Sequence, residues 1–165
     1  MDLAIRGRKA LLAASSSGLG LACASALARE GCEVFINGRD PARLEQARQQ
    51  IADSAGAEVH AVCADINTEA GRQTLVQACP QADILVNINA GPPPGVLADW
   101  DHAAWIAALE ANFLAPVLLI RALLPGMRER RFGRIVNITS AMVKSPRPHM
   151  ALSSSARTGL TAFSK

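Results

Sequence analysis

Residues 9–20 read KALLAASSSGLG, a short apolar run followed by a turn of small residues. The run, at residues 9–14, has the composition of a buried strand, and the alanine-rich residues 19–29 predict a helix that ends at Gly31. Gly18 and Gly20 permit tight helix–strand packing, and the free N–H groups at the helix start, with the serine hydroxyls, suit a pyrophosphate. The alternative is an ordinary turn rich in serine and glycine, but the strand–turn–helix context favours a phosphate site.

The same alternation of apolar runs and helical patterns continues along the chain. Strands are predicted at residues 33–37, 58–64, 83–87 and 133–139, and helices from residue 41, over 68–79, over 101 to about 128, and from about 152. Prolines 92–94 predict a loop. These units predict an α/β fold, a Rossmann-like doubly wound parallel sheet in strand order 3-2-1-4-5, within one dinucleotide-binding domain over residues 1–165. Its ligand is expected at the carboxyl ends of the strands.

The composition excludes several classes of partner. The chain has 165 residues, of which 50% are hydrophobic and 19% charged, and a net charge of +3. This charge is too small for the basic surface that nucleic acid requires, and the RERR run at residues 128–131 is expected to be solvated at a helix end. No apolar stretch is expected to be long enough to span a membrane.

The four cysteines are scattered, with no CxxC pair and no nearby histidine cluster. We therefore expect no metal site and no disulfide framework, and a cytoplasmic location. A secretory signal is the alternative for the amino terminus, where basic residues precede an apolar stretch. Ser15, Ser16, Ser17 and Gly18 interrupt that stretch, which disfavours the signal.

A resemblance becomes specific at the first turn. Residues 13–20 resemble the TGxxxGxG turn of short-chain dehydrogenases/reductases, with Ala13 and Ala14 at the threonine and first glycine. In the same family, Asp65 of CADIN matches the aspartate that contacts adenine. Asn112 of EANFLAPV matches the helix asparagine of the catalytic tetrad, and Ser140 of RIVNITS matches the catalytic serine. The resemblance implies hydride transfer between a nicotinamide cofactor and a small-molecule carbonyl or alcohol, as in oxoacyl-carrier-protein reductases.

The end of the second strand indicates which dinucleotide is preferred. NAD-selective Rossmann domains carry an acidic residue there, whereas a 2′-phosphate requires a cation. This chain has Asn37-Gly38-Arg39, with no acid before Asp40. A guanidinium can hold a phosphate through paired hydrogen bonds, so Arg39 favours NADP(H). The alternative is a surface arginine that pairs with Asp40.

After the fourth strand the family carries an NNAG turn beside the nicotinamide. This chain reads NINAGPPPG at residues 87–95, so its NAG triplet is displaced by one position. Either the strand is one residue longer or the turn is rebuilt. Asn89 is the expected contact in both cases.

The largest departure concerns the family's YxxxK motif, because this chain contains no tyrosine. Aligning LSSSARTGLTAFSK, residues 152–165, puts Ser153 at the tyrosine and Arg157 at the lysine. A serine hydroxyl is a much weaker acid than a phenol of pKa about 10, and a guanidinium cannot join a proton relay. Arg157 is still able to hydrogen-bond a ribose. His149 is either an alternative acid or an ordinary loop histidine.

The family continues well beyond 165 residues, with a sixth and a seventh strand, so the resemblance implies the first two-thirds of such a protein, incomplete at its C-terminus. Family members form homodimers and homotetramers through the long helix after the fourth strand. The apolar residues 112–124 permit this, although a helix that covers its own sheet would look the same.

The leading hypothesis is an NADP(H)-dependent oxidoreductase, and the rival is a catalytically impaired NADP-binding scaffold or sensor. The predicted nucleotide contacts are Ser15, Ser17, Gly18, Leu19, Gly20, Arg39, Asp65, Ile66, Asn89, Ala90 and Gly91. The predicted catalytic positions are Asn112, Ser140, Ser153 and Arg157.

Overall fold

The computed structural model describes residues 3–165, and within them five strands form one parallel sheet in the order β3-β2-β1-β4-β5. The strands are β1 (Lys9–Leu12), β2 (Glu33–Gly38), β3 (Val59–Cys63), β4 (Ile84–Asn87) and β5 (Arg134–Asn137). The predicted fold class and strand order are confirmed. The first strand is shorter than predicted, because Ala13 and Ala14 already belong to the turn and Ala14 has a positive φ of 41°.

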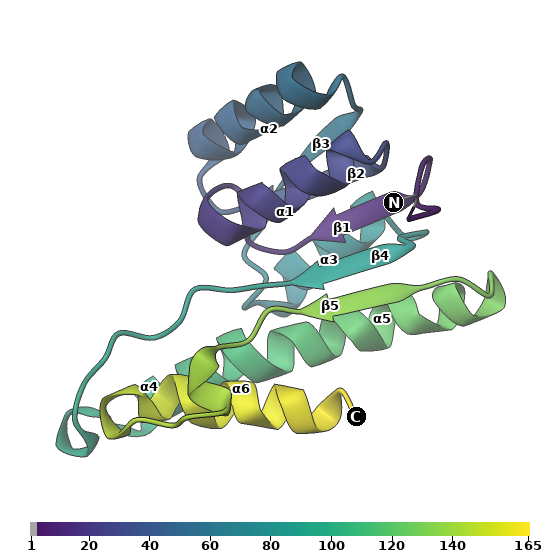
Figure 1. Cartoon of the computed structure of the whole chain (residues 1–165). Coiled ribbons are helices and arrows are strands. Elements are labelled where there is room, and N and C mark those ends of the chain that lie inside the picture. Colours follow the sequence, from purple (N-terminus) through teal and green to yellow (C-terminus); the bar gives the residue numbers. More distant parts are fainter. Residues whose placement is uncertain (1–2) are drawn as a thin grey trace.

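Helices cover both faces of this sheet (Figure 1). They are α1 (Gly18–Arg29), α2 (Pro41–Ala55), α3 (Glu69–Ala78), α4 (His102–Leu109), α5 (Ala115–Glu129) and α6 (Ala151–Phe163). The strand alternation decides which core each residue joins. Ala10 and Leu12 pack with α1 and α2, whereas Leu11 and Ala13 pack with α3 and α5. Because both faces are buried, the strand reads as a continuous apolar run.

Gly31 ends α1 as predicted. Its φ is 82°, its N–H donates to the carbonyl of Ala28 (2.9 Å), and the N–H of Cys32 donates to Leu27 (3.1 Å). This pair of bonds is a Schellman motif, which requires a left-handed residue and so favours glycine. The chain thereby turns directly from α1 into β2.

The helix predicted over residues 101 to about 128 is interrupted by a π-turn, Glu110–Leu114, between α4 and α5. The N–H of Ala115 bonds to the carbonyl of Glu110, five residues back. Over its full length, His102–Glu129, the helix is long and apolar enough to cross a membrane by length and composition alone, although Glu110 and Arg121 interrupt its apolar sequence. In the structure, Leu119, Leu123 and Met127 are buried against the sheet.

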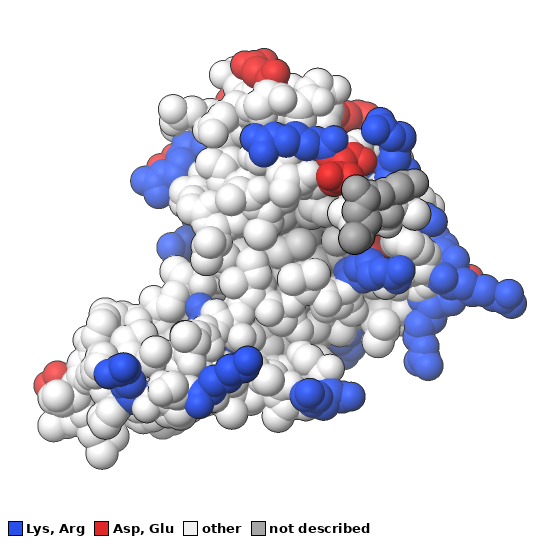
Figure 2. All heavy atoms as spheres, in the orientation of Figure 1, with Lys and Arg blue, Asp and Glu red and all other residues white. Residues whose placement is uncertain are grey.

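The arginine run lies at the end of α5, and Arg128 and Arg131 are exposed there as predicted. Arg130 is bound to other protein groups rather than to solvent alone. Its Nη2 donates to the carbonyl of Ala82 (2.8 Å), and its Nε lies 3.4 Å from the carboxylate of Asp83. Figure 2 shows lysine and arginine side chains grouped on the side where the strands begin, away from their carboxyl ends.

We predict that the four cysteines react with Ellman's reagent at very different rates. None is in a disulfide within the described residues; Cys63 is exposed, whereas Cys32 and Cys79 are buried. Burial raises the pKa of the Cys79 thiol to about 12, and a protonated thiol is not the reactive form. Cys63 should label first and Cys79 only on unfolding, with Cys63→Ser as the control; rapid labelling of Cys79 in the native protein would contradict this packing.

Candidate functional site

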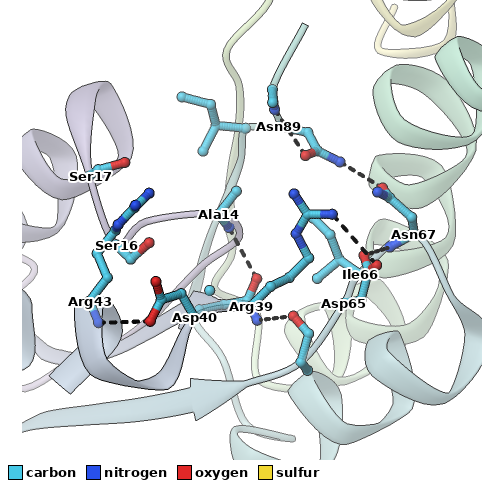
Figure 3. A pocket seen from close by; sticks show the side chains of 15 residues that line it. Ala14, Ser16, Ser17, Arg39, Asp40, Arg43, Asp65, Ile66, Asn67 and Asn89 are labelled. Atoms are coloured by element: carbon cyan, nitrogen blue, oxygen red, sulfur yellow. Dashed lines mark hydrogen bonds and ion pairs between the residues drawn. The ribbon is translucent and has the colours of Figure 1, made fainter. Parts of the chain in front are cut away.

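The carboxyl ends of the central strands open into a cleft of about 520 Å³, shown in Figure 3. It lies beside β1 and β4, where the strand order reverses and ligands bind in open α/β sheets. Six predicted contacts line it: Ser17, Arg39, Asp65, Ile66, Asn89 and Ala90. The other lining residues, which sequence reasoning did not select, are Ala14, Ser16, Asn37, Gly38, Asp40, Arg43, Ala64, Asn67 and Ile88.

The carboxamide of Asn37 joins three strand ends beneath the cleft. Asn37 is only 1% exposed; its Oδ1 accepts from the N–H of Ala14 (3.1 Å), and its Nδ2 donates to the carbonyls of Val62 and Ala64 (3.0 Å each). One buried side chain thus satisfies three backbone groups where β1, β2 and β3 end. Buried polar groups that are fully paired in this way favour a single arrangement of the chain.

The prediction that Ser15 contacts the nucleotide is wrong for this structure. Ser15 is fully buried, its hydroxyl donates to the carbonyl of Leu12 (2.9 Å), and the same oxygen accepts from the N–H of Asn37 (2.9 Å). It supports the turn from inside. Ser16 and Ser17 are the serines that face the cleft (Figure 3). Nothing in a run of three serines indicates which one turns inward.

The glycines of the turn have different tasks. Gly18 has a φ of 55° and begins α1, whereas a Cβ on Gly20 would lie only 2.6 Å from the carbonyl oxygen of Ala14. Gly20 therefore acts by close helix–strand packing, and neither it nor the exposed Leu19 lines the cleft. Ser17 makes no side-chain cap to α1, so the first N–H groups of this helix have no acceptor within it and can bind an anion.

Two arginines line the cleft. Arg39 follows β2 with its side chain 70% exposed, and its Nη1 lies 3.8 Å from the carboxylate of Asp65, so its partner is not Asp40 (Figure 3). Asp40 instead caps α2 by accepting from the N–H groups of Ala42 and Arg43. Arg43 lines the same cleft, and its position in the first turn of a helix that starts at the cleft was the available signal for it.

The turn after β4 also borders the cleft. β4 ends at Asn87, so the strand is not extended and the additional residue, Ile88, belongs to the turn. The Nδ2 of Asn89 donates to Asn67 Oδ1 (2.8 Å) and to the carbonyl of Ala111 (3.0 Å), and its Oδ1 accepts from the N–H of Ala90 (2.9 Å). The side chain of Asn89 is therefore engaged by protein groups, which fix the course of the turn.

Arg157 is directed at the protein rather than at the cleft. Its Nη2 donates to the carbonyl of Asn89 (3.0 Å), its Nη1 to those of Ile138 (2.9 Å) and Thr139 (3.4 Å), and its Nε to Ser153 Oγ (3.3 Å). Burial lowers the pKa of this guanidinium from its usual value. The expectation that Arg157 is free to bond a ribose is thus corrected, because its donors hold the turns after β4 and β5 to α6.

The other residues that the sequence predicts to be catalytic lie near this arginine or in the π-turn. Ser153 is 3% exposed, and a Cβ on Gly91, which lies outside the cleft, would be 3.9 Å from its hydroxyl. Asn112 lies in the π-turn, where its Nδ2 makes two long bonds of 3.4 Å and its Oδ1 has no partner among residues 3–165. Ser140 is half-buried and its hydroxyl accepts from the N–H of Met142 (3.2 Å).

Two further groups lie outside this arrangement. His149 is exposed and lies in a short 3₁₀ helix, Pro148–Met150, just before α6; its carbonyl accepts from the N–H of Gly95 (3.0 Å). One group with metal-ligand chemistry occurs in the part of the chain that the structure describes: Glu33, Glu58 and His60, near the start of β2 and β3. It lies away from the cleft, and Lys9 already pairs with Glu33 at 3.5 Å.

Comparison with known proteins places these features in a family. Residues 8–165 match the family model for short chain dehydrogenases. The chain is 35% identical to "Uncharacterized oxidoreductase YvaG" of Bacillus subtilis, covering 100% of this chain and 63% of that protein. It is 30% identical to D-beta-hydroxybutyrate dehydrogenase of Cupriavidus necator, covering 98% and 64%. L-sorbose reductase of Gluconobacter frateurii, solved with NADPH and L-sorbose, superposes with a TM-score of 0.95 at 31% identity, covering 99% and 64%.

We predict that Ala14→Gly stabilises the protein. Ala14 has a φ of 41°, which costs an alanine about 1–2 kcal/mol, and the greater freedom of glycine in the unfolded chain offsets about half of that. The free energy of unfolding in urea should rise by about 0.5–1 kcal/mol. Ala13→Gly is the matched control; Ala13 is buried and has no positive φ, so glycine should destabilise there. A loss of stability in Ala14→Gly would contradict strain at this turn.

Proposed function

Because the chain belongs to the short-chain dehydrogenase family, we propose that it forms the NADP(H)-binding part of an oxidoreductase that reduces a carbonyl or oxidises an alcohol. The chain spans 52–64% of the length of the curated relatives that it matches, so this is a proposal for the whole protein. One observation carries it. Arg39 and Arg43 both line the cleft, Arg43 beside Ser16 and Arg39 toward Asp65 (Figure 3), while Asp40 is occupied as a helix cap.

The guanidinium groups of Arg39 and Arg43 favour a 2′-phosphate in the cleft. An exposed pair such as Arg39–Asp65, at 3.8 Å, contributes at most about 1 kcal/mol, so a phosphate with nearly two negative charges can replace it. Guanidinium groups hold phosphate oxygens through paired, charge-assisted hydrogen bonds. The solved L-sorbose reductase was described with NADPH, which agrees with this choice.

The rest of the cleft fits a dinucleotide laid across the strand ends. We assign the pyrophosphate to the first turn of α1 with Ser16 and Ser17, because free N–H groups and hydroxyls are grouped there. Asp65 and Ile66 border the adenine side, and Asn89 and Ala90 border the nicotinamide side. When bound, NADPH supplies the hydride.

On the substrate side, we assign Ser140 to orient the carbonyl oxygen, since its hydroxyl is half-buried and accepts only a backbone N–H among the described residues. Asn112 and Arg157 hold the geometry of the surrounding turns. Ser153 stands where the family has its tyrosine, but its hydroxyl is buried and serves Arg157. Since serine is also a poor acid, we assign to Ser153 the support of Arg157 rather than proton transfer.

A second candidate is an NADP-binding scaffold or sensor with impaired catalysis. Two observations favour it. The chain contains no tyrosine, and the guanidinium of Arg157 donates to backbone carbonyls. Both candidates require the dinucleotide, and they differ in turnover.

We further propose that the protein acts as a homodimer or homotetramer in the cytoplasm. Ile106, Leu114 and Leu124, on the helix from α4 to α5, are large apolar side chains that remain 38–51% exposed. Exposed apolar side chains along one helix support association through that helix.

Arg39→Ala and Arg43→Ala test the cofactor. Each should weaken NADPH binding about tenfold and leave NADH binding within twofold, because only NADPH carries the phosphate that these side chains would bond. Isothermal titration calorimetry measures both affinities. Arg48→Ala, on the exposed face of α2, is the matched control. Equal losses for NADPH and NADH would argue against a 2′-phosphate beside these arginines.

Ser140→Ala separates the two candidates. In the oxidoreductase, NADPH oxidation with ketones, sugars or oxoacyl thioesters should fall about a hundredfold or more, because the hydroxyl acts on the reacting carbonyl. NADPH affinity should stay the same, and Ser145→Ala, in the same exposed loop, should change neither. Tight NADPH binding by the unmodified protein without turnover of any substrate would instead favour the scaffold or sensor.

A further inference from the structure

A charged side chain joins the loop after β3 to the π-turn. The Nη1 of Arg72, in α3, donates to the carbonyl of Ile66 (2.9 Å) and to Glu110 Oε1 (2.7 Å). The side chain of Arg72 is only 13% exposed and that of Glu110 is 29% exposed. Since water screens this pair little, it is stronger and more exacting in geometry than the exposed Arg39–Asp65 pair.

A neutral link runs parallel to the charged one. The Nδ2 of Asn89 bonds both Asn67, in the loop after β3, and the carbonyl of Ala111, in the π-turn. Ile66 and Asn67 both line the cleft. The π-turn is therefore fastened twice to the cleft wall, once through Arg72 and once through Asn89.

The π-turn is a local departure from α-helical bonding. It replaces bonds between residues four apart by bonds between residues five apart, and such single turns are frequent at functional sites. Asn112 lies in its middle, held only by its own two 3.4 Å bonds, with its Oδ1 unpaired among the residues the structure describes. The position of this carboxamide thus depends on what holds the turn.

We propose that Arg72 is a positioning residue, through which occupancy of the adenosine side of the cleft sets the conformation of the π-turn and so of Asn112. The inference rests on the proposed function, because Ile66 borders adenosine only if a dinucleotide binds as assigned above. A ligand shifts an equilibrium between two conformations by its differential affinity for them. By linkage, binding at the nicotinamide side then raises the affinity for adenosine by the same factor.

The experiment uses adenosine 2′,5′-bisphosphate, which has the adenosine and its 2′-phosphate but no nicotinamide. The chain has two tryptophans, Trp105 in α4 and Trp100 just before it, with ring centroids 6.0 Å apart. They precede the π-turn and do not line the cleft. In the unmodified protein, the probe should change the tryptophan emission spectrum, with a midpoint equal to the affinity measured by calorimetry.

Arg72→Met removes the guanidinium and keeps most of the stem. The variant should still bind the probe, and the emission change should be lost, while its NADPH affinity falls about fivefold more than its probe affinity. Glu110→Gln removes the charge that Arg72 pairs with but keeps the side-chain size and an acceptor oxygen. This variant should lose most of the emission change, and it tests the proposal if Arg72→Met does not fold. Arg48→Met, which breaks the exposed pair with Glu45, should behave as the unmodified protein.

The outcomes are distinguishable. Probe binding without an emission change in the unmodified protein, or a full change in both variants, would overturn the coupling and leave the proposed function standing. Equal losses of probe and NADPH affinity in Arg72→Met would also overturn it, since Arg72 would then only shape the adenine loop. No binding of the probe or of NADPH by the unmodified protein would overturn the proposed function and the coupling with it.

Discussion

The buried carboxamide of Asn37 is the interaction on which the cleft depends. Parallel strands all end at one edge, where their last N–H and carbonyl groups lose their ladder partners. Asn37 satisfies such groups from the turn after β1 and from the end of β3. The hydroxyl oxygen of Ser15 in turn accepts from the backbone N–H of Asn37. The backbone can therefore stay open toward a ligand without leaving buried polar groups unpaired.

Arg157 performs a similar task at the other half of the sheet. A buried cation without a carboxylate is costly unless other acceptors surround it, and here three backbone carbonyls and a serine hydroxyl do so. The carbonyls belong to the turns after β4 and β5, which border the nicotinamide and substrate sides in the proposed complex. Arg157, which the sequence alignment puts at the family's lysine position, thus clamps these strand ends together, and its Nε donates to Ser153.

The two halves of the site therefore depart from the family to different degrees. The dinucleotide cleft keeps its glycine-bearing turn, its cations and its strand-end geometry, so cofactor binding is the function that the residues support best. The half proposed to be catalytic has Asn112 and Ser140 at predicted positions but has no phenol, because the chain contains no tyrosine. The links through Arg72 and Asn89 join these halves, so that a nucleotide held by one half can affect the geometry of the other.

The sequence by itself determined the α/β class, the glycine cap of α1 and most of the cleft-lining turns, because apolar periodicity and glycine positions are local consequences of backbone geometry. The strand order was predicted from the doubly wound arrangement that alternating strands and helices imply. The sequence also identified Arg39, whose place after a strand is enough to predict its location. Only the tertiary structure decided that Ser15 turns inward, that Arg43 joins Arg39, that Arg157 bonds carbonyls and that a π-turn carries Asn112. These outcomes depend on which acceptors distant segments bring within hydrogen-bond distance, and no local pattern encodes that.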